Sequence, residues 1–91
     1  MEYRAAIVRK DLGEIIPRRA FDRANMSGAW YKHVIPVWAA GPGLGRAFKS
    51  EDAAIRAMTR SVRRYKLDPD SFRGLVWQRG RANEPALTVA I

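Results

Sequence analysis

The sequence contains no cysteine and a single histidine among its 91 residues. The absence of cysteine excludes disulfide bonds, thiolate metal ligands and cysteine nucleophiles, and one histidine cannot build a histidine-rich zinc site. No stretch approaches the run of about 18 apolar residues that a membrane-spanning helix requires. The start Met1-Glu2-Tyr3-Arg4 also lacks the basic and then apolar order of a signal peptide. We therefore expect a cytoplasmic protein that uses no metal, no cofactor and no membrane.

Acidic residues are scarce relative to basic ones. The chain has 9 Asp and Glu against 17 Lys and Arg, which gives a formal net charge of +8 at pH 7 and an isoelectric point near 10.9. This balance favours polyanionic partners such as nucleic acid. Because 47% of the residues are hydrophobic, the chain still has enough apolar material to fold, and residues 1–91 are expected to form one small domain.

Alternating apolar residues predict strands in several regions. Residues 3–10, 72–78 and 87–91 alternate, and residues 29–40 form the most strand-like segment. Pro36 cannot donate a hydrogen bond within a sheet, so its strand is predicted to lie at a sheet edge or to contain a bulge there. Glycines at 41, 43 and 45 predict a hairpin turn, followed by a short returning strand at 46–49.

Two segments carry the pattern of helices. Pro17 can occupy the first helical position of a short helix that residues 25–28 end. A longer helix is predicted from the N-cap Ser50 to about Lys66, with two acidic residues in its first turn. Its predicted apolar stripe consists of Ile55, Met58, Val62 and Tyr65. The order β-α-β-β-α-β-β predicts an α+β domain, with a small antiparallel sheet of four to five strands and two helices on one face.

No motif in the sequence indicates that the protein is an enzyme. The glycine-rich segment continues into Arg46-Ala47-Phe48, whereas a phosphate-binding loop continues with Lys and then Ser or Thr. His33 has no motif that links it to a serine and a carboxylate. A minor alternative is a toxin-like ribonuclease, in which Tyr31, His33 and neighbouring arginines share proton transfer and phosphate stabilisation.

Arginines on the longer helix are the main candidates for a binding site. Arg56, Arg60 and Arg63 follow one another at spacings of four and three, so they project from one side of the helix and can follow a phosphate backbone. The competing interpretation is a solvated helix face whose late arginines complement the helix dipole. The leading hypothesis is a small basic, non-enzymatic nucleic-acid-binding module with a second contact in the turn before the last strand. The residues predicted to bind nucleic acid are Arg56, Arg60, Arg63, Arg64, Arg79 and Arg81.

A second hypothesis rests on the apolar surface of the segment 29–40. Trp30, Val34 and Trp38 share one side of the predicted strand and are candidates for the anchor of a protein interface, although core packing is the competing interpretation. The protein would then be a small inhibitor or adaptor of the kind that phages or mobile elements encode, such as an anti-CRISPR protein, docking on a nucleic-acid-handling complex. A homodimer is a further possibility, because an exposed terminal strand at 87–91 can pair with its copy.

Two short segments resemble known nucleic-acid-binding families. Residues 48–57, Phe48-Lys49-Ser50-Glu51-Asp52-Ala53-Ala54-Ile55-Arg56-Ala57, resemble the passage from the third strand to the second helix of the RNA recognition motif. That family carries base-stacking rings on its strands, whereas residues 45–48 contain one ring and residues 5–8 contain none. The hairpin and helix from Trp30 to Met58 are similar to the arm-binding domains of phage-type integrases, which insert a sheet into the major groove.

Overall fold

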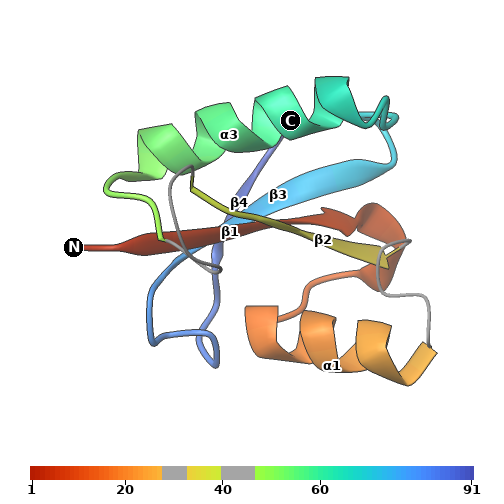
Figure 1. Cartoon of the computed structure of the whole chain (residues 1–91). Coiled ribbons are helices and arrows are strands. Elements are labelled where there is room, and N and C mark those ends of the chain that lie inside the picture. Colours follow the sequence, from red (N-terminus) through yellow and green to blue (C-terminus); the bar gives the residue numbers. More distant parts are fainter. Residues whose placement is uncertain (28–32, 40–46) are drawn as a thin grey trace.

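The computed structural model describes residues 1–27, 33–39 and 47–91 (Figure 1). Several of the predicted features lie outside these ranges. They are Trp30, Tyr31, the predicted hairpin turn at 41–45 and the first residue of the predicted returning strand, Arg46.

Four strands form one antiparallel sheet with the spatial order β2-β1-β3-β4. The strands are β1 (Tyr3–Arg9), β2 (Val34–Val37), β3 (Phe72–Gln78) and β4 (Leu87–Val89). β2 is an edge strand, which confirms the placement expected from Pro36. Within its described part, the predicted returning strand is reduced to a single antiparallel bridge between Tyr3 and Phe48. The α+β class is confirmed.

Local sequence signals set the ends of the helices. The described helices are α1 (Pro17–Ser27) and α3 (Glu51–Arg64), and a short 3-10 turn, η1 (Lys10–Leu12), follows β1. α1 begins at Pro17, as predicted. The Ser50 hydroxyl oxygen accepts a hydrogen bond from the Ala53 backbone N–H at 3.1 Å, so Ser50 caps α3 as predicted. No helix in the described part of the chain is long and apolar enough to cross a membrane.

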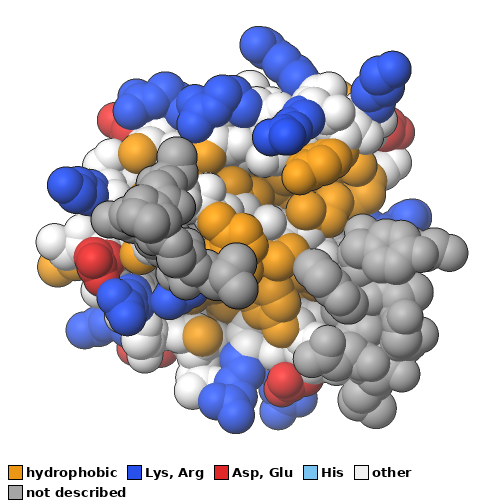
Figure 2. Space-filling view, in the orientation of Figure 1, with side chains coloured by type: hydrophobic (Ala, Val, Ile, Leu, Met, Phe, Trp, Pro, Cys, Tyr) orange, Lys and Arg blue, Asp and Glu red, His pale blue; other side chains and the backbone are white. Residues whose placement is uncertain are grey.

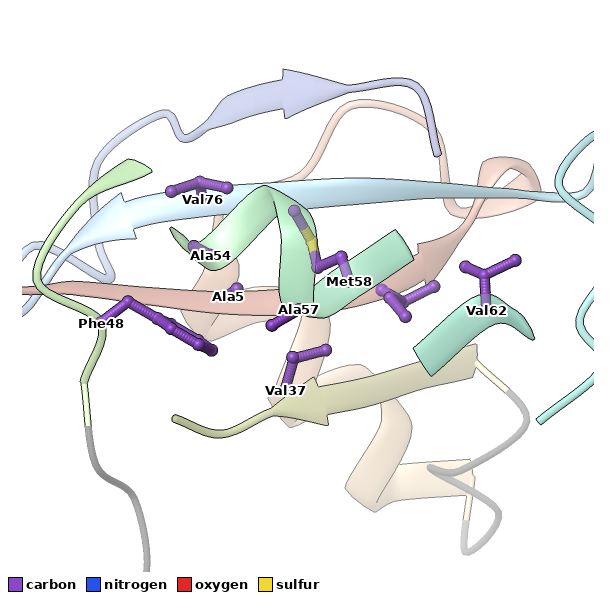
Figure 3. Close-up of a cluster of buried hydrophobic side chains, with 9 residues drawn as sticks. Ala5, Val37, Phe48, Ala54, Ala57, Met58, Val62 and Val76 are labelled. Atoms are coloured by element: carbon purple, nitrogen blue, oxygen red, sulfur yellow. The ribbon is translucent and has the colours of Figure 1, made fainter. Parts of the chain in front are cut away.

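The two helices pack on opposite faces of the sheet, so the prediction that both cover one face is wrong. On one face, Met58 of α3 packs in a cluster with Ala5 of β1 (Figure 3). On the other face, Ala20 of α1 packs in a cluster with Val8 of β1. Figure 1 shows the sheet between the two helices.

The central strands explain why each face needs a helix. Successive side chains of a strand point to opposite faces, so a sheet covered on one face alternates between apolar and polar residues. β1 is buried at four consecutive positions, 5–8, and β3 at 74–77. Both faces of the central strands are therefore covered, and they do not offer the open stacking surface that the resemblance to the RNA recognition motif implies.

The buried side of α3 differs in part from the predicted stripe. Its buried residues are Ala54, Ala57, Met58 and Val62. Tyr65 was predicted to join them but is 57% exposed, because α3 ends at Arg64 and Tyr65 follows as its C-cap. The small alanines allow α3 to approach the sheet closely, and the tyrosine lies at the protein surface.

Candidate nucleic-acid interface

Four exposed arginines lie on the outer side of α3, away from Met58 and Val62. They are Arg56, Arg60, Arg63 and Arg64. With a rise of about 1.5 Å per residue, they span about 12 Å along the helix. Lys and Arg side chains gather along α3 in Figure 2. Within the described residues, the ion pairs involve other arginines, so the charges of these four are not neutralised by a described carboxylate.

The helix dipole accounts for only part of this arrangement. Arg63 and Arg64 lie in the last turn of α3, where the partial negative charge of the helix terminus favours cations. This effect falls off within one turn. Arg56 and Arg60 lie further from the C-terminus, so capping of the dipole does not explain them. These two residues favour an anionic partner more strongly than the last two do.

A groove of about 520 Å³ lies between α3 and the edge strand β2. The exposed aromatic residues of the groove are Trp38, which is 49% exposed, and Tyr65. Figure 2 shows hydrophobic side chains reaching the surface below the basic side chains of α3. The described residues that line the groove are Pro36, Val37, Trp38, Phe48, Ala57, Arg60, Ser61, Arg64 and Tyr65.

The groove joins residues that the sequence analysis assigned to different hypotheses. Arg60 and Arg64 were predicted to bind nucleic acid, and Trp38 was predicted as a protein-interface anchor. Arg60 and Arg64 are one helical turn apart on α3, and both line the groove together with Trp38. The structure therefore defines one surface, referred to below as the Trp38 groove, that is both aromatic and basic.

Trp38 is flanked on its other side by Arg4. The Arg4 guanidinium carbon lies 6.0 Å from the centre of the Trp38 ring, within the range of a cation–π interaction. The two residues also line a smaller hollow of about 180 Å³ together with Phe21 and Trp77, which belong to the cluster on the α1 face. Arg4 thus approaches Trp38 from the α1 side of the sheet, and the Trp38 groove lies on the α3 side.

The two arginines of the turn between β3 and β4 are paired with carboxylates. Arg79 donates a hydrogen bond of 2.8 Å to the Glu2 carboxylate, and this contact holds the pKa of Glu2 below its ordinary value. Arg81 lies 3.6 Å from the Glu84 carboxylate. Ala82, in the same turn, packs against the cluster on the α1 face. These two arginines therefore differ from the row on α3 in having described carboxylate partners.

The residues predicted to anchor a protein interface differ in burial. Val34 is fully buried in the cluster on the α1 face, so the expectation that it anchors a partner is corrected: it is a core residue. Trp30 lies outside the described residues, and of the two described members Trp38 is the exposed one. His33 is half-buried, and its expected partner Tyr31 lies outside the described residues. Within the described ranges, no three His, Asp or Glu side chains are grouped to hold a metal ion.

Sequence reasoning missed two residues of this surface. Tyr65 continues the apolar spacing of α3, so the sequence predicts that it is buried. It lies at the surface because α3 ends at Arg64, one residue before it. Arg4 gave no local signal, because its contact with Trp38 depends on the pairing of β1 with β2, in which Ala5 lies opposite Val37. A correct pairing of residues 3–9 with 34–37 would have indicated this neighbour.

No family model, no curated protein and no solved structure matches the chain. The fold and the groove define an α+β protein with an antiparallel sheet between two helices and a basic, aromatic surface along one of them.

Proposed function

We propose that the protein is a non-enzymatic module that binds nucleic acid through the arginines of α3 and the adjoining Trp38 groove. The observation that carries the proposal is the row of four exposed arginines on one side of a helix, next to an exposed tryptophan. Cationic side chains beside exposed aromatic rings are the combination that proteins use to hold a phosphate backbone and unpaired bases.

Phosphate contacts have a measurable consequence. Each phosphate that a protein neutralises releases condensed counterions, so the logarithm of the binding constant falls linearly with the logarithm of the salt concentration. Four contacts correspond to a slope of about −3 for a single strand and nearly −4 for a duplex. Binding by the row on α3 is therefore expected to weaken steeply with salt.

The experiment is a fluorescence anisotropy titration of the full chain with labelled single-stranded and duplex DNA and RNA. Salt is varied from about 50 to about 200 mM, the range over which such contacts change affinity strongly. A variant with glutamine at positions 56, 60, 63 and 64 serves as the negative control, with its fold checked by circular dichroism. Binding that is absent at low salt, or equal for the variant and the wild type, would contradict the proposal.

A second candidate function is docking on another protein, as an inhibitor or adaptor of a nucleic-acid-handling complex would do. The half-exposed Trp38 beside arginines favours it, because Trp and Arg are enriched among the anchors of protein interfaces. The net charge of +8 favours an acidic partner surface. The test is a pull-down from nuclease-treated lysate: a partner held by the wild type and lost with Trp38→Ala supports docking, and equal recovery by both proteins contradicts it.

Pairing of two copies is a separate proposal that rests on β4. This strand lies at the sheet edge, and its Leu87 is 46% exposed. Because β4 has only three residues, such pairing would form few backbone hydrogen bonds. We therefore expect a weak, concentration-dependent dimer. Sedimentation velocity tests this expectation, and a monomeric mass at every protein concentration would exclude the pairing.

A further inference from the structure

We infer that the Trp38 groove selects single-stranded nucleic acid by stacking an unpaired base on Trp38 while Arg60 and Arg64 hold the neighbouring phosphates. This inference rests on the proposed function and specifies the class of nucleic acid that the site takes. The arginine row alone fits the phosphates of a single strand or a duplex, so the choice between them depends on the groove.

The position of Trp38 suits a stacking surface. The residue directly follows β2, and about half of its area is exposed, whereas tryptophan is usually well buried. Arg4 lies against the ring from the α1 side and is not among the described residues that line the groove. Trp38 also lines the groove on the α3 side, and we place the stacked base on this part of its surface. A ring already oriented by a cation–π contact also loses less freedom when a ligand binds.

The walls of the groove supply the charges that a stacked nucleotide needs. Arg60 and Arg64 lie about 6 Å apart along the helix axis, and both line the groove from α3. Tyr65 adds a second exposed ring at the end of the same wall. Aromatic rings within a positively charged groove are the usual arrangement for binding single strands without strict sequence preference.

The groove is large enough to receive an unpaired base. A volume of about 520 Å³ lies within the range of sites that enclose a small organic group, about 300 to 1,000 Å³. An unpaired base can turn into such a groove, whereas the bases of a duplex are stacked inside the helix and present only their edges. A duplex would reach the outer arginines of α3 and would leave Trp38 uncovered.

The composition of the groove also suits a nucleotide. Arg, Trp and Tyr are enriched at protein interfaces as well, so the test below is designed to separate the two occupants. Here Arg60 and Arg64 line the groove itself, next to the aromatic rings. The aromatic rings can contact the base of a nucleotide, and the neighbouring arginines can contact its phosphate.

The test compares Trp38 variants on oligo(dT), a single strand, and on a DNA duplex of the same length and at the same salt concentration. A stacked base contributes about 5- to 150-fold to affinity. We expect Trp38→Ala to lower oligo(dT) affinity within this range and to leave duplex affinity unchanged. Trp38→Phe keeps a ring and is expected to retain most of the affinity. Leu87→Ala is the matched control, because Leu87 is equally exposed but lies on the opposite sheet edge, in β4.

A second measurement does not depend on the stability of the alanine variant. Stacking quenches indole fluorescence, so oligo(dT) is expected to quench the tryptophan emission of the wild-type chain. Trp38→Phe retains the other two tryptophans, Trp30 and Trp77, and is expected to lose most of this quenching. Quenching of equal size in both proteins would overturn the stacking inference.

The outcomes separate this inference from the proposed function. If single strand and duplex bind equally, with a steep salt dependence and no effect of Trp38→Ala, nucleic-acid binding stands and the stacking inference falls. If Leu87→Ala reduces oligo(dT) binding as much as Trp38→Ala does, the stacking inference also falls. If neither nucleic acid binds at low salt, both proposals fall, and loss of a captured protein with Trp38→Ala would assign the groove to protein docking instead.

Discussion

Gly74 of β3 and Met58 of α3 meet so closely that no side chain fits between them. A Cβ atom at position 74 would lie 2.7 Å from the Met58 sulfur and 2.8 Å from a methyl group of Val89 on β4. Contacts this short require a neighbour to move, and Met58 is fully buried. The absence of a side chain at Gly74 thus leaves the space that the end of the Met58 side chain fills.

We expect Gly74→Ala to lower the free energy of unfolding by about 1 to 3 kcal/mol, the usual cost of overpacking a close-packed core. Urea denaturation measures the change. Combining Gly74→Ala with Met58→Ala makes room for the new methyl group, so the double variant is expected to lose less stability than the sum of the two single variants. Additive losses would show that the two residues do not compete for the same space.

The cap of α3 is expected to stabilise the helix measurably. Ser50→Ala removes the hydrogen bond to the Ala53 N–H and is expected to cost about 0.5 to 2 kcal/mol. Ser50→Asp keeps an oxygen acceptor and adds a negative charge near the positive end of the helix dipole, so it is expected to retain wild-type stability. Thermal denaturation of both variants tests this, and equal stability of Ser50→Ala and the wild type would contradict a role for the cap.

Asp68 is expected to make the free energy of unfolding depend on pH in the acid range. Its carboxylate accepts hydrogen bonds from the Asp70 N–H at 3.0 Å and from the Ser71 hydroxyl at 2.8 Å. These bonds favour the charged form, the backbone bond most strongly, and hold the pKa of Asp68 below its ordinary value. Because the folded-state pKa lies below the unfolded one, the stabilisation is complete above the unfolded pKa and is lost as pH falls through the folded one.

The variant that tests this is Asp68→Asn, which keeps an oxygen acceptor but has no carboxylate to titrate. We expect it to be less stable than the wild type near neutral pH and to approach wild-type stability once the wild-type carboxylate is protonated. Urea denaturation at a series of pH values measures the difference. A difference that stays constant down to the lowest pH would show that Asp68 does not contribute through its charge.

Much of the fold could be predicted because its signals are local. The strand at 72–78, the Pro17 start of α1 and the Ser50 cap of α3 each depend on residues next to one another in the sequence. The face that each helix covers could not be predicted in this way. An apolar run such as residues 5–8 shows that both sides of a strand need cover, but it does not say which helix supplies it.

In the candidate site, too, the features that depend on local sequence could be predicted and those that depend on strand pairing could not. Helical spacing is a local property, and it correctly placed Arg56, Arg60 and Arg63 on one exposed side of α3. Val34 and Trp38 looked equivalent by alternation, yet one is fully buried and the other half-exposed. The difference arises because β2 ends at Val37, so Trp38 passes beyond the paired strand while Val34 is held against the α1 face.

The comparison of two arginines distinguishes a specific phosphate site from attraction by net charge. Arg60→Gln and Arg79→Gln remove the same charge from exposed positions. Arg60 lines the Trp38 groove, whereas Arg79 is paired with Glu2. We expect Arg60→Gln to weaken nucleic-acid binding and to reduce the magnitude of the salt slope by about one, the change typical of one lost phosphate contact.

Arg79→Gln is expected to leave both the affinity and the salt slope near their wild-type values, because a guanidinium engaged with a carboxylate has less charge to offer a phosphate. The anisotropy titration with varied salt measures both quantities for both variants. Equal losses for the two variants would mean that the chain attracts nucleic acid through its overall charge of +8. In that case the row of arginines on α3 would be a solvated helix face and not a binding site.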